Sequence, residues 1–466
     1  MIWRLNNFMN FKNNYLKRFF NTSIVFFIGT VLTKTVSFFL LPLYTKYLDP
    51  ATFGNYDLIL SIINLAVPLA FFQIWDGMFR FAFDENDDNW KKKTITNSMV
   101  ISIFGSIVYI VIQFLISIIY PDFGGIYVYL YGVSLGFTYI FTVSSRIYLD
   151  NKLFALSGVV NTVINAISNI ILIKYLNYGV DALYISFVIG SLAQIILIEF
   201  KLHIFSKIKI SLIDKCLINQ LIKFSLPLCI STITYWLLSG FTKVMVVKYL
   251  GAYDNGLYAV ANKFSGIIIL VVNVFQFAWN ELIYTLTKNK NNNKIYDKGL
   301  SIVIRITLYG TGMFIIFSKI IYPYFVDKSY YAGEYLLPIS IIGLAFNSLA
   351  SFEGTLFLAK KESKLLFRST IYAAIFNVLS CSICIRILGC FGAILSLTIS
   401  FAINAINRFY NLNKNIEYKV FFKGTCVLIA GALSFYYINS NIINILIIII
   451  FIFILLFEFK EEIKKM

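Results

Sequence analysis

Three lysines stand inside apolar stretches of the sequence, where a charged side chain is costly and is usually tied to function. They are Lys34, Lys243 and Lys263. Lys34 lies near the middle of its stretch, and Thr30 and Ser37 share its face at helical spacing. Because fixed cations attract anions strongly in a low-dielectric interior, the three lysines predict a site for an anionic group. The alternative is that their long side chains snorkel to the membrane surface, above all those of Lys243 and Lys263.

Carboxylates that could carry a coupling proton or cation are few in these stretches. Glu353 is the best placed, within an apolar run and next to a glycine, and Asp76 lies nearer the end of its run. Intramembrane carboxylates often form proton relays, so both are candidates for a coupling ion. A fixed ion pair between Glu353 and one of the lysines is the alternative. The further polar residues that we expect to line an internal cavity are Asp57, Asn64, Arg80 and Asn273.

The sequence contains none of the groupings that catalysis or nucleotide binding requires. His203 is the single histidine, and no carboxylate stands where it would make this histidine a base or a ligand. There is no phosphate-binding loop, no glycine-rich dinucleotide motif and no cluster with metal-ligand spacing. We therefore expect that the protein is not an enzyme and that it has no cofactor and no metal.

The elements that must position these side chains are membrane-spanning helices. Hydrophobic residues make up 59% of the chain and charged residues only 14%, against about a quarter in soluble domains. About 20 mostly apolar residues cross a bilayer, and about 14 such runs occur. They lie near residues 22–44, 55–75, 98–120, 125–145, 154–175, 180–199, 221–247, 256–285, 300–321, 333–358, 365–386, 390–407, 420–438 and 441–458.

The net charge of +17 has a source other than nucleic acid binding. Cytoplasmic loops of membrane proteins collect Lys and Arg. Most of the 40 Lys and Arg residues fall on one side, for example in segments 91–93 and 360–364, once both termini are placed inside. The asymmetry predicts a multi-pass inner-membrane protein with both termini cytoplasmic, and no nucleic-acid partner.

A sequence motif occurs twice and indicates an internal duplication. KYL at residues 46–48 is followed by Gly54-x-Tyr56, and KYL at 248–250 is followed by Gly256-x-Tyr258. A separation of about 200 residues is the kind of repeat from which many transporters are built. We predict an N-terminal lobe at residues 1–205, a C-terminal lobe at 206–410, and two extra spans with a cytoplasmic tail at 411–466.

Several of these segments carry a family resemblance. The matching pieces are LPLYTKYL at 41–48, FGNYDL at 53–58, SLPL at 225–228, YLG at 249–251 and GLYAVANK at 256–263. Across nearly its whole length the chain resembles the polysaccharide-transport branch of the multidrug/oligosaccharidyl-lipid/polysaccharide (MOP) exporter superfamily, the Wzx-like O-antigen and capsule flippases.

The resemblance implies an all-α, MATE-like membrane protein in which two duplicated six-helix lobes surround a central cavity. It implies a flippase that moves undecaprenyl-pyrophosphate-linked oligosaccharide units by alternating access, with membrane lipids, a polysaccharide polymerase and a chain-length regulator as further partners. Lys34, Lys243 and Lys263 suit such an anionic cargo. A lipid II flippase and a drug/cation antiporter are alternatives within the superfamily, and a membrane-embedded polysaccharide polymerase is one outside it.

Overall fold

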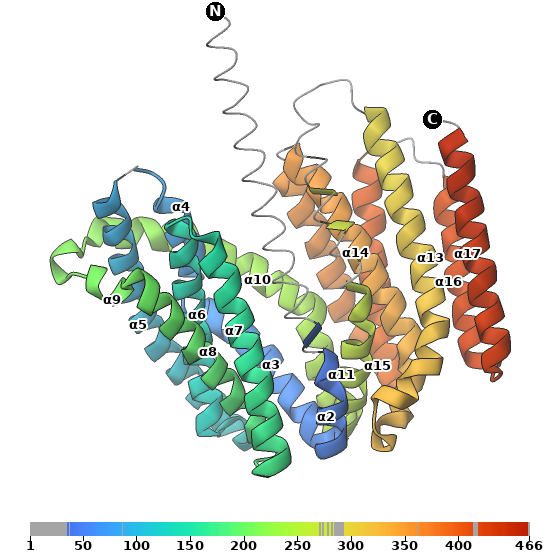
Figure 1. Ribbon diagram of the computed structural model, residues 1–466, viewed down its shortest axis with the longest axis horizontal. Helices are drawn as coiled ribbons and strands as arrows, with labels where there is room; N and C mark the ends of the chain where they lie inside the picture. Colours follow the sequence, from blue (N-terminus) through green and yellow to red (C-terminus); the bar gives the residue numbers. More distant parts are fainter. Residues whose placement is uncertain are drawn as a thin grey trace, which may run out of the picture. The chain divides into compact units, whose positions relative to one another are not determined.

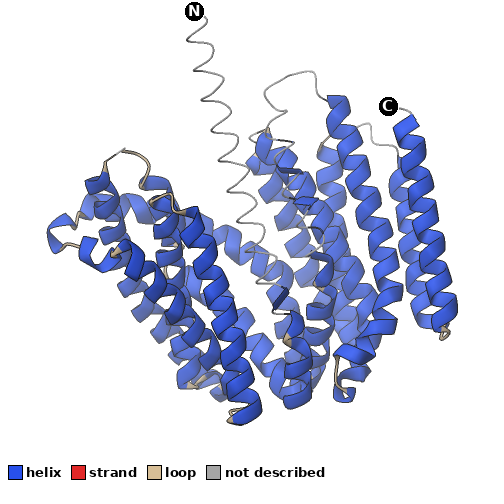
Figure 2. Cartoon of the chain, viewed as in Figure 1, coloured by secondary structure: helices blue, strands red, loops and turns tan. Residues whose placement is uncertain are grey.

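The structure is a computed structural model that describes residues 35–36, 38–85, 87–269, 272, 275–276, 279–280, 283, 293–360, 362–412 and 418–464. Within these residues the regular secondary structure is entirely helical (Figure 2). The expected all-α class is therefore confirmed. A helix suits the apolar runs because it satisfies its internal backbone N–H and C=O groups without water, which a bilayer core does not supply.

Among the described residues, 11 helices are long and apolar enough to cross a membrane. They are α3 (Pro50–Ala70), α5 (Asp88–Ile119), α6 (Ile126–Ile147), α7 (Asn151–Ile170), α8 (Asp181–Leu202), α10 (Lys215–Leu250), α13 (Asn293–Phe325), α14 (Leu337–Ala359), α15 (Ser363–Asn411), α16 (Tyr418–Tyr437) and α17 (Asn441–Lys464).

The difference between these 11 candidates and the predicted 14 spans has three local causes. Helix α15 runs for 49 residues and covers two predicted spans, which are joined by a kink at Gly389. The φ of 58° at this position suits a glycine. The predicted span 22–44 lies largely outside the described residues. Of the predicted span 256–285, the structure describes α11 (Ala252–Ser265), whereas about half of the residues from 266 to 285 lie outside the described residues.

The chain forms two compact units that divide it at three points, and two of these divisions fall inside helices, within α3 and within α10. The first unit comprises residues 1–37 and 63–232, and contains α4 (Ile74–Phe81), α5 to α8 and α9 (Ile204–Lys207). In it α8 packs on α6 and α7. Gln194 of α8 donates to Thr142 of α6 at 3.0 Å and accepts from Asn161 of α7 at 2.7 Å, so a polar network joins the three helices.

The second unit comprises residues 38–62 and 233–466. It contains α2 (Leu41–Tyr47), the start of α3, the end of α10, α11 and α13 to α17. Helix α14 packs on α15, and α13 contacts both α16 and α17 (Figure 1). Glu458 of α17 pairs with Arg305 of α13 at 3.4 Å and with Lys423 of α16 at 3.0 Å. The predicted boundaries at 1–205, 206–410 and 411–466 stay a prediction.

Candidate functional site

The two copies of the repeated motif contact each other directly within the second unit. A Cβ atom placed on Gly54 of α3 would clash with the carbonyl oxygen of Ala252 and lie 2.6 Å from the amide nitrogen of Gly256 in α11. In return, a Cβ atom on Gly256 would clash with the carbonyl oxygen of Pro50. The Asn255 amide also donates to the Gly54 carbonyl oxygen at 2.7 Å. Only glycine at both positions allows the two backbones to approach so closely.

Asp57, a predicted cavity residue, lies three positions after Gly54 on α3. It forms an ion pair with Lys243 of α10, one of the predicted cations. The Lys243 Nζ lies 2.8 Å from the Asp57 Oδ2, and the two side chains are 18% and 8% exposed. On the same faces of these helices, the Trp236 indole N–H donates to the Ser61 carbonyl oxygen at 2.8 Å. Helices α3 and α10 are therefore joined by two polar contacts, one ionic and one neutral.

Lys263 of α11, the second predicted cation in this unit, lies among three aromatic rings. Its Nζ is 4.9 Å from the ring centre of Phe53, 5.6 Å from that of Tyr44 and 6.0 Å from that of Tyr56. Cations are attracted to the faces of aromatic rings at such distances. Because all three rings belong to largely buried side chains, Lys263 is held inside the unit and does not snorkel freely.

The charges of these residues act on one another. Lys263 interacts electrostatically with both Asp57 and Lys243. The three side chains thus combine one carboxylate with two ammonium groups, which leaves one positive charge in excess. A low-dielectric environment strengthens the attraction of such a cluster for an anion.

Glu353 of α14 is buried, with 3% of its surface exposed. The charged group that acts on it is Arg408 of α15. The Arg408 guanidinium donates to the carbonyl oxygen of Ala350 at 2.6 Å and to the hydroxyls of Ser369 and Thr370, each at 2.9 Å. Its hydrogen bonds therefore go to neutral acceptors. The charged neighbour of the buried Glu353 carboxylate is therefore an arginine, and not Lys243 or Lys263.

The other predicted residues lie elsewhere. Asp76 accepts a hydrogen bond from the Gln73 amide at 2.8 Å in the first unit. Arg80 is exposed and pairs with Asp84 one turn later, and Asn64 is exposed on α3. Lys34 and Asn273 lie outside the described residues. The predicted cavity-lining and coupling roles of all these residues stay predictions.

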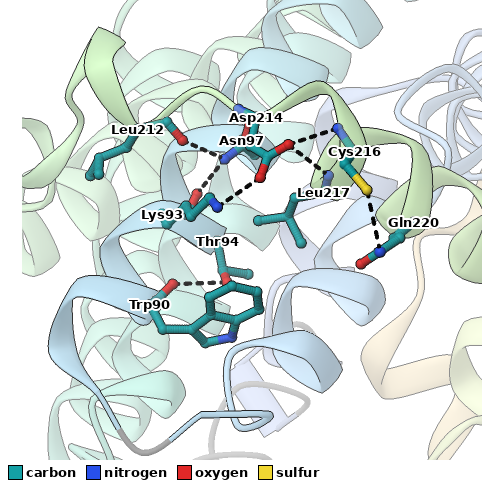
Figure 3. Close-up of polar contacts among 9 residues, drawn as sticks. All are labelled: Trp90, Lys93, Thr94, Asn97, Leu212, Asp214, Cys216, Leu217 and Gln220. Carbon is teal, nitrogen blue, oxygen red and sulfur yellow. Dashed lines mark hydrogen bonds and ion pairs between the residues drawn. The ribbon is translucent and has the colours of Figure 1, made fainter.

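A second polar cluster joins the start of α5 to the segment that precedes α10 (Figure 3). The Lys93 Nζ lies 2.7 Å from the Asp214 Oδ2, and the Asn97 amide donates to the Leu212 carbonyl oxygen at 3.0 Å. The hydrogen bond from Lys93, with those from the backbone N–H groups of Cys216 and Leu217, holds the pKa of the Asp214 carboxyl below its ordinary value. The cluster ties residues 212–217 to α5 within the first unit.

An apolar cavity of about 180 Å³ lies in the second unit and shares no residue with the charged cluster. Its walls come from residues 267, 268, 272 and 275 and from α13 and α14, and include Phe275, Phe314 and Phe352. Among the described residues, no group of three or more His, Cys, Asp or Glu side chains is placed to hold a metal ion.

Two features of the site are not among the residues predicted from the sequence. Arg408 follows directly after the apolar run 390–407, so the run does not mark it as an intramembrane charge, although its helix continues to Asn411. The rings around Lys263 come from α2 and α3, which are about 200 residues away along the chain. The position of Lys263 in the sequence does not indicate that these aromatic rings surround it. The nearest signal is that Tyr44, Phe53 and Tyr56 all fall within the segments that carry the family resemblance.

The comparisons with known proteins agree on family and fold. Residues 20–279 match the model of the family described as polysaccharide biosynthesis protein. No curated protein sequence matches the chain. A structure of the lipid II flippase MurJ in an inward closed conformation superposes with a TM-score of 0.70 at 16% identity, covering 95% of this chain and 99% of that one.

Transporters of the MOP superfamily have the same fold. An inward-facing multidrug resistance MATE family transporter of that superfamily superposes with a TM-score of 0.69 at 14% identity, covering 84% of this chain and 95% of that one. A MATE structure in the straight conformation gives a TM-score of 0.57 at 15% identity. These solved structures are of a flippase and of transporters, not of enzymes.

The family match covers more than half of the sequence, and the structural likeness extends over most of both chains. The resemblance found in the motifs is thereby confirmed. This chain is a multi-pass membrane protein with the fold of MOP-superfamily transporters, and it belongs to the polysaccharide biosynthesis protein family.

Proposed function

We propose that the protein is a flippase that moves undecaprenyl-pyrophosphate-linked oligosaccharide repeat units across the bacterial cytoplasmic membrane by alternating access, for O-antigen, capsule or exopolysaccharide synthesis. The observation that carries this proposal is the cluster of Asp57, Lys243 and Lys263, with its excess positive charge among membrane helices. The family match gives the link to polysaccharide synthesis. The fold it shares with a lipid II flippase is compatible with a lipid-linked cargo.

The sign of the charge separates this cargo from a drug cation. A pyrophosphate group is anionic, and its transfer through an apolar environment requires fixed positive charge to replace the lost hydration. Lys243 and Lys263 supply such charge, and we assign them to cargo binding. A cationic drug would meet repulsion from both. A drug/cation antiporter and a membrane-embedded polymerase are therefore the less favoured functions.

A lipid II flippase is the second candidate, because the superposition on MurJ covers 95% of this chain. Both cargoes carry a polyprenyl pyrophosphate, so the charged cluster suits either. The sugar decides between them. Restoration of growth in cells depleted of their own lipid II flippase would favour lipid II, whereas restored surface glycan in cells lacking their own oligosaccharide flippase would favour the proposed cargo.

The proposed function is tested by transport in proteoliposomes loaded with a fluorescent undecaprenyl-pyrophosphate oligosaccharide. The parent protein should expose the label to an external quencher, and Lys243→Gln should reduce the initial rate by about tenfold or more. Lys248→Gln is the matched control, since Lys248 is exposed on the same helix and lies beside Tyr249. Equal rates for parent protein and protein-free vesicles would refute the proposal.

We further propose Lys34 as a third cargo-binding cation. Lys34→Ala should leave the amount of protein in the membrane near normal and abolish glycan export, and Lys34→Arg should restore part of it. The amount of protein is measured by immunoblot of membranes and export by surface glycan staining. Loss of the protein itself in Lys34→Ala would assign Lys34 to folding.

Glu353 is proposed as the group that couples transport to an ion gradient, with Asp76 as the alternative. Its burial beside Arg408 is the supporting observation. In vesicles with an imposed pH gradient, Glu353→Gln should transport at a rate that no longer depends on the gradient. A variant that responds as the parent does would exclude Glu353 as the coupling site.

The remaining parts of the proposal concern location and partners. We place both termini in the cytoplasm of a bacterial inner membrane, with membrane lipids, a polysaccharide polymerase and a chain-length regulator as partners. Cysteines introduced at positions 91–93 should react with a membrane-impermeant reagent only in inverted vesicles. Reaction at these positions in intact cells would reverse the orientation.

A further inference from the structure

The contact between Asp57 and Lys243 poses a problem for a cation that must bind cargo. The Lys243 ammonium already has an anionic partner at 2.8 Å inside the protein. Any anion that reaches Lys243 must compete with that carboxylate. Resting on the proposed function, we propose that Asp57 is an internal competitor that occupies Lys243 in the unloaded protein and sets a minimum charge for the cargo headgroup. Asp57 is thereby a specificity-determining residue.

The geometry lets Lys243 change partners without separating its helix from α3. The Lys243 side chain is 18% exposed and that of Asp57 only 8%, so the lysine is the more accessible member of the pair. Trp236 lies two turns earlier on the same face of α10 and donates to the Ser61 carbonyl oxygen. This neutral contact is unaffected when the ion pair opens, so it can keep α3 and α10 together.

When Lys243 binds a ligand, the Asp57 carboxylate loses its partner, and Lys263 can compensate its charge. A buried charge stripped of its partner is strongly destabilising. Lys263 already interacts with the Asp57 charge and is held in place by the rings of Tyr44, Phe53 and Tyr56. With two cations around one carboxylate, one cation can be transferred to a ligand while the other continues to compensate Asp57.

The competition favours headgroups that carry more than one negative charge. At equal distance and dielectric, Coulomb energy scales with the product of the charges. When a singly charged carboxylate or sulfonate binds Lys243, the Coulomb energy it gains is no larger than the energy lost by separating Lys243 from Asp57. A pyrophosphate, with at least two negative charges, gains more than the exchange costs. The pair therefore rejects singly charged lipids, which are abundant in membranes, without any contact to their chains.

The test uses the purified full-length chain in detergent and three probes that share one isoprenoid chain. They are farnesyl pyrophosphate, farnesyl monophosphate and farnesoic acid, with binding measured by equilibrium dialysis. The parent should bind the pyrophosphate about tenfold or more tighter than the carboxylate. Asp57→Asn should bind all three probes about five- to tenfold tighter than the parent, because no carboxylate then competes with them for Lys243.

Two controls tie the effect to Lys243. Asp57→Asn/Lys243→Gln should bind the probes no tighter than Lys243→Gln alone, because the released cation is then missing. Asp49→Asn removes a nearby carboxylate that caps α3 through Ala51 and Thr52, and it should leave the affinities unchanged. The charge series on the parent protein needs no variant, so equal binding of carboxylate and pyrophosphate would overturn the inference even if Asp57→Asn does not fold.

The outcomes separate this inference from the proposed function. If the parent binds pyrophosphate but Asp57→Asn binds the carboxylate no tighter, Asp57 is only structural and the inference fails while the cargo class stands. If the parent binds carboxylate and pyrophosphate equally, there is no charge threshold and the inference fails as well. If the parent binds none of the three probes, the cargo class fails and the inference fails with it.

Discussion

Helices α3 and α11 begin with the same motif, yet the chemistry they carry is different. Gly54 and Gly256 occupy equivalent positions, and each lies against the backbone of the other copy. Three residues later the first copy has Asp57, whereas the second has Ala259. Four residues after that, the first copy has Ser61 and the second has Lys263. The shared positions make the contact, and the differing positions supply the charges.

This comparison shows how a duplicated element yields an asymmetric site. Two copies with identical charges would place like charges together across their contact, which is unfavourable at low dielectric. Here one copy contributes the carboxylate and the other a cation, and α10 adds Lys243 to the carboxylate. The duplication therefore accounts for the packing of α3 on α11, and divergence between the copies accounts for the charged cluster.

The largest expected effect comes from disrupting the glycine contact that the two copies share. Gly54→Ala places a Cβ atom against the backbone of α11, which cannot move aside as a side chain can. We expect a loss of about 3 kcal/mol or more in unfolding free energy, or no folded protein, as measured by thermal unfolding in detergent.

Gly158→Ala is the matched control for this substitution. Gly158 also lies in a helix, but apart from its own helix backbone and chain neighbours no atom stands within 4 Å of the position its Cβ would take. The change should be neutral or stabilise by up to about 1 kcal/mol, as alanine does in helices. Equal unfolding temperatures for the two variants would show that the contact between the copies is not close in the folded protein.

The next largest effect comes from removing the charge that only the first copy has. Asp57→Asn leaves Lys243 and Lys263 together without a carboxylate, and should lower the stability of the unliganded protein by about 2 to 3 kcal/mol. Asp57→Asn/Lys243→Gln should recover most of this loss, because no unpaired charge remains. A double variant less stable than the single one would mean that the two side chains are not coupled.

A smaller effect is expected at a position where the second copy has gained a polar side chain. Asn255 corresponds to Phe53 of the first copy, is fully buried and donates to the Gly54 carbonyl oxygen at 2.7 Å. Asn255→Ala should cost about 1 to 2 kcal/mol through the lost hydrogen bond. Hydrogen exchange at the amides of α3 would also rise, and unchanged exchange there would count against this contact.

The smallest effect concerns the equivalent pair of Ser61 and Lys263. Lys263→Met keeps the length of the side chain but loses the attraction to the three rings, and should cost about 1 kcal/mol. Ser61→Ala should change stability by less than about 0.5 kcal/mol, because Trp236 bonds to the backbone of Ser61. A larger loss of stability in Ser61→Ala than in Lys263→Met would show that the rings do not hold Lys263.

Much of this molecule follows from the sequence, because lipid leaves the chain few options. An apolar run of about 20 residues must be helical to satisfy its backbone, so most spans coincide with predicted runs. Lys243 and Lys263 were identifiable as candidate site residues because a lysine within such a run is costly. For the same reason Arg408, just past the end of a run, was missed.

The sequence by itself determined the helical class, the many spans, the repeat and the positive sign of the candidate site. These depend on composition and local spacing, which are properties of the chain order alone. Only the tertiary structure decided that Asp57 pairs with Lys243, that the rings of Tyr44, Phe53 and Tyr56 surround Lys263, and that the two glycines touch. Each of these contacts joins residues about 200 positions apart, and periodicity within a helix carries no information about the partner that its faces will meet.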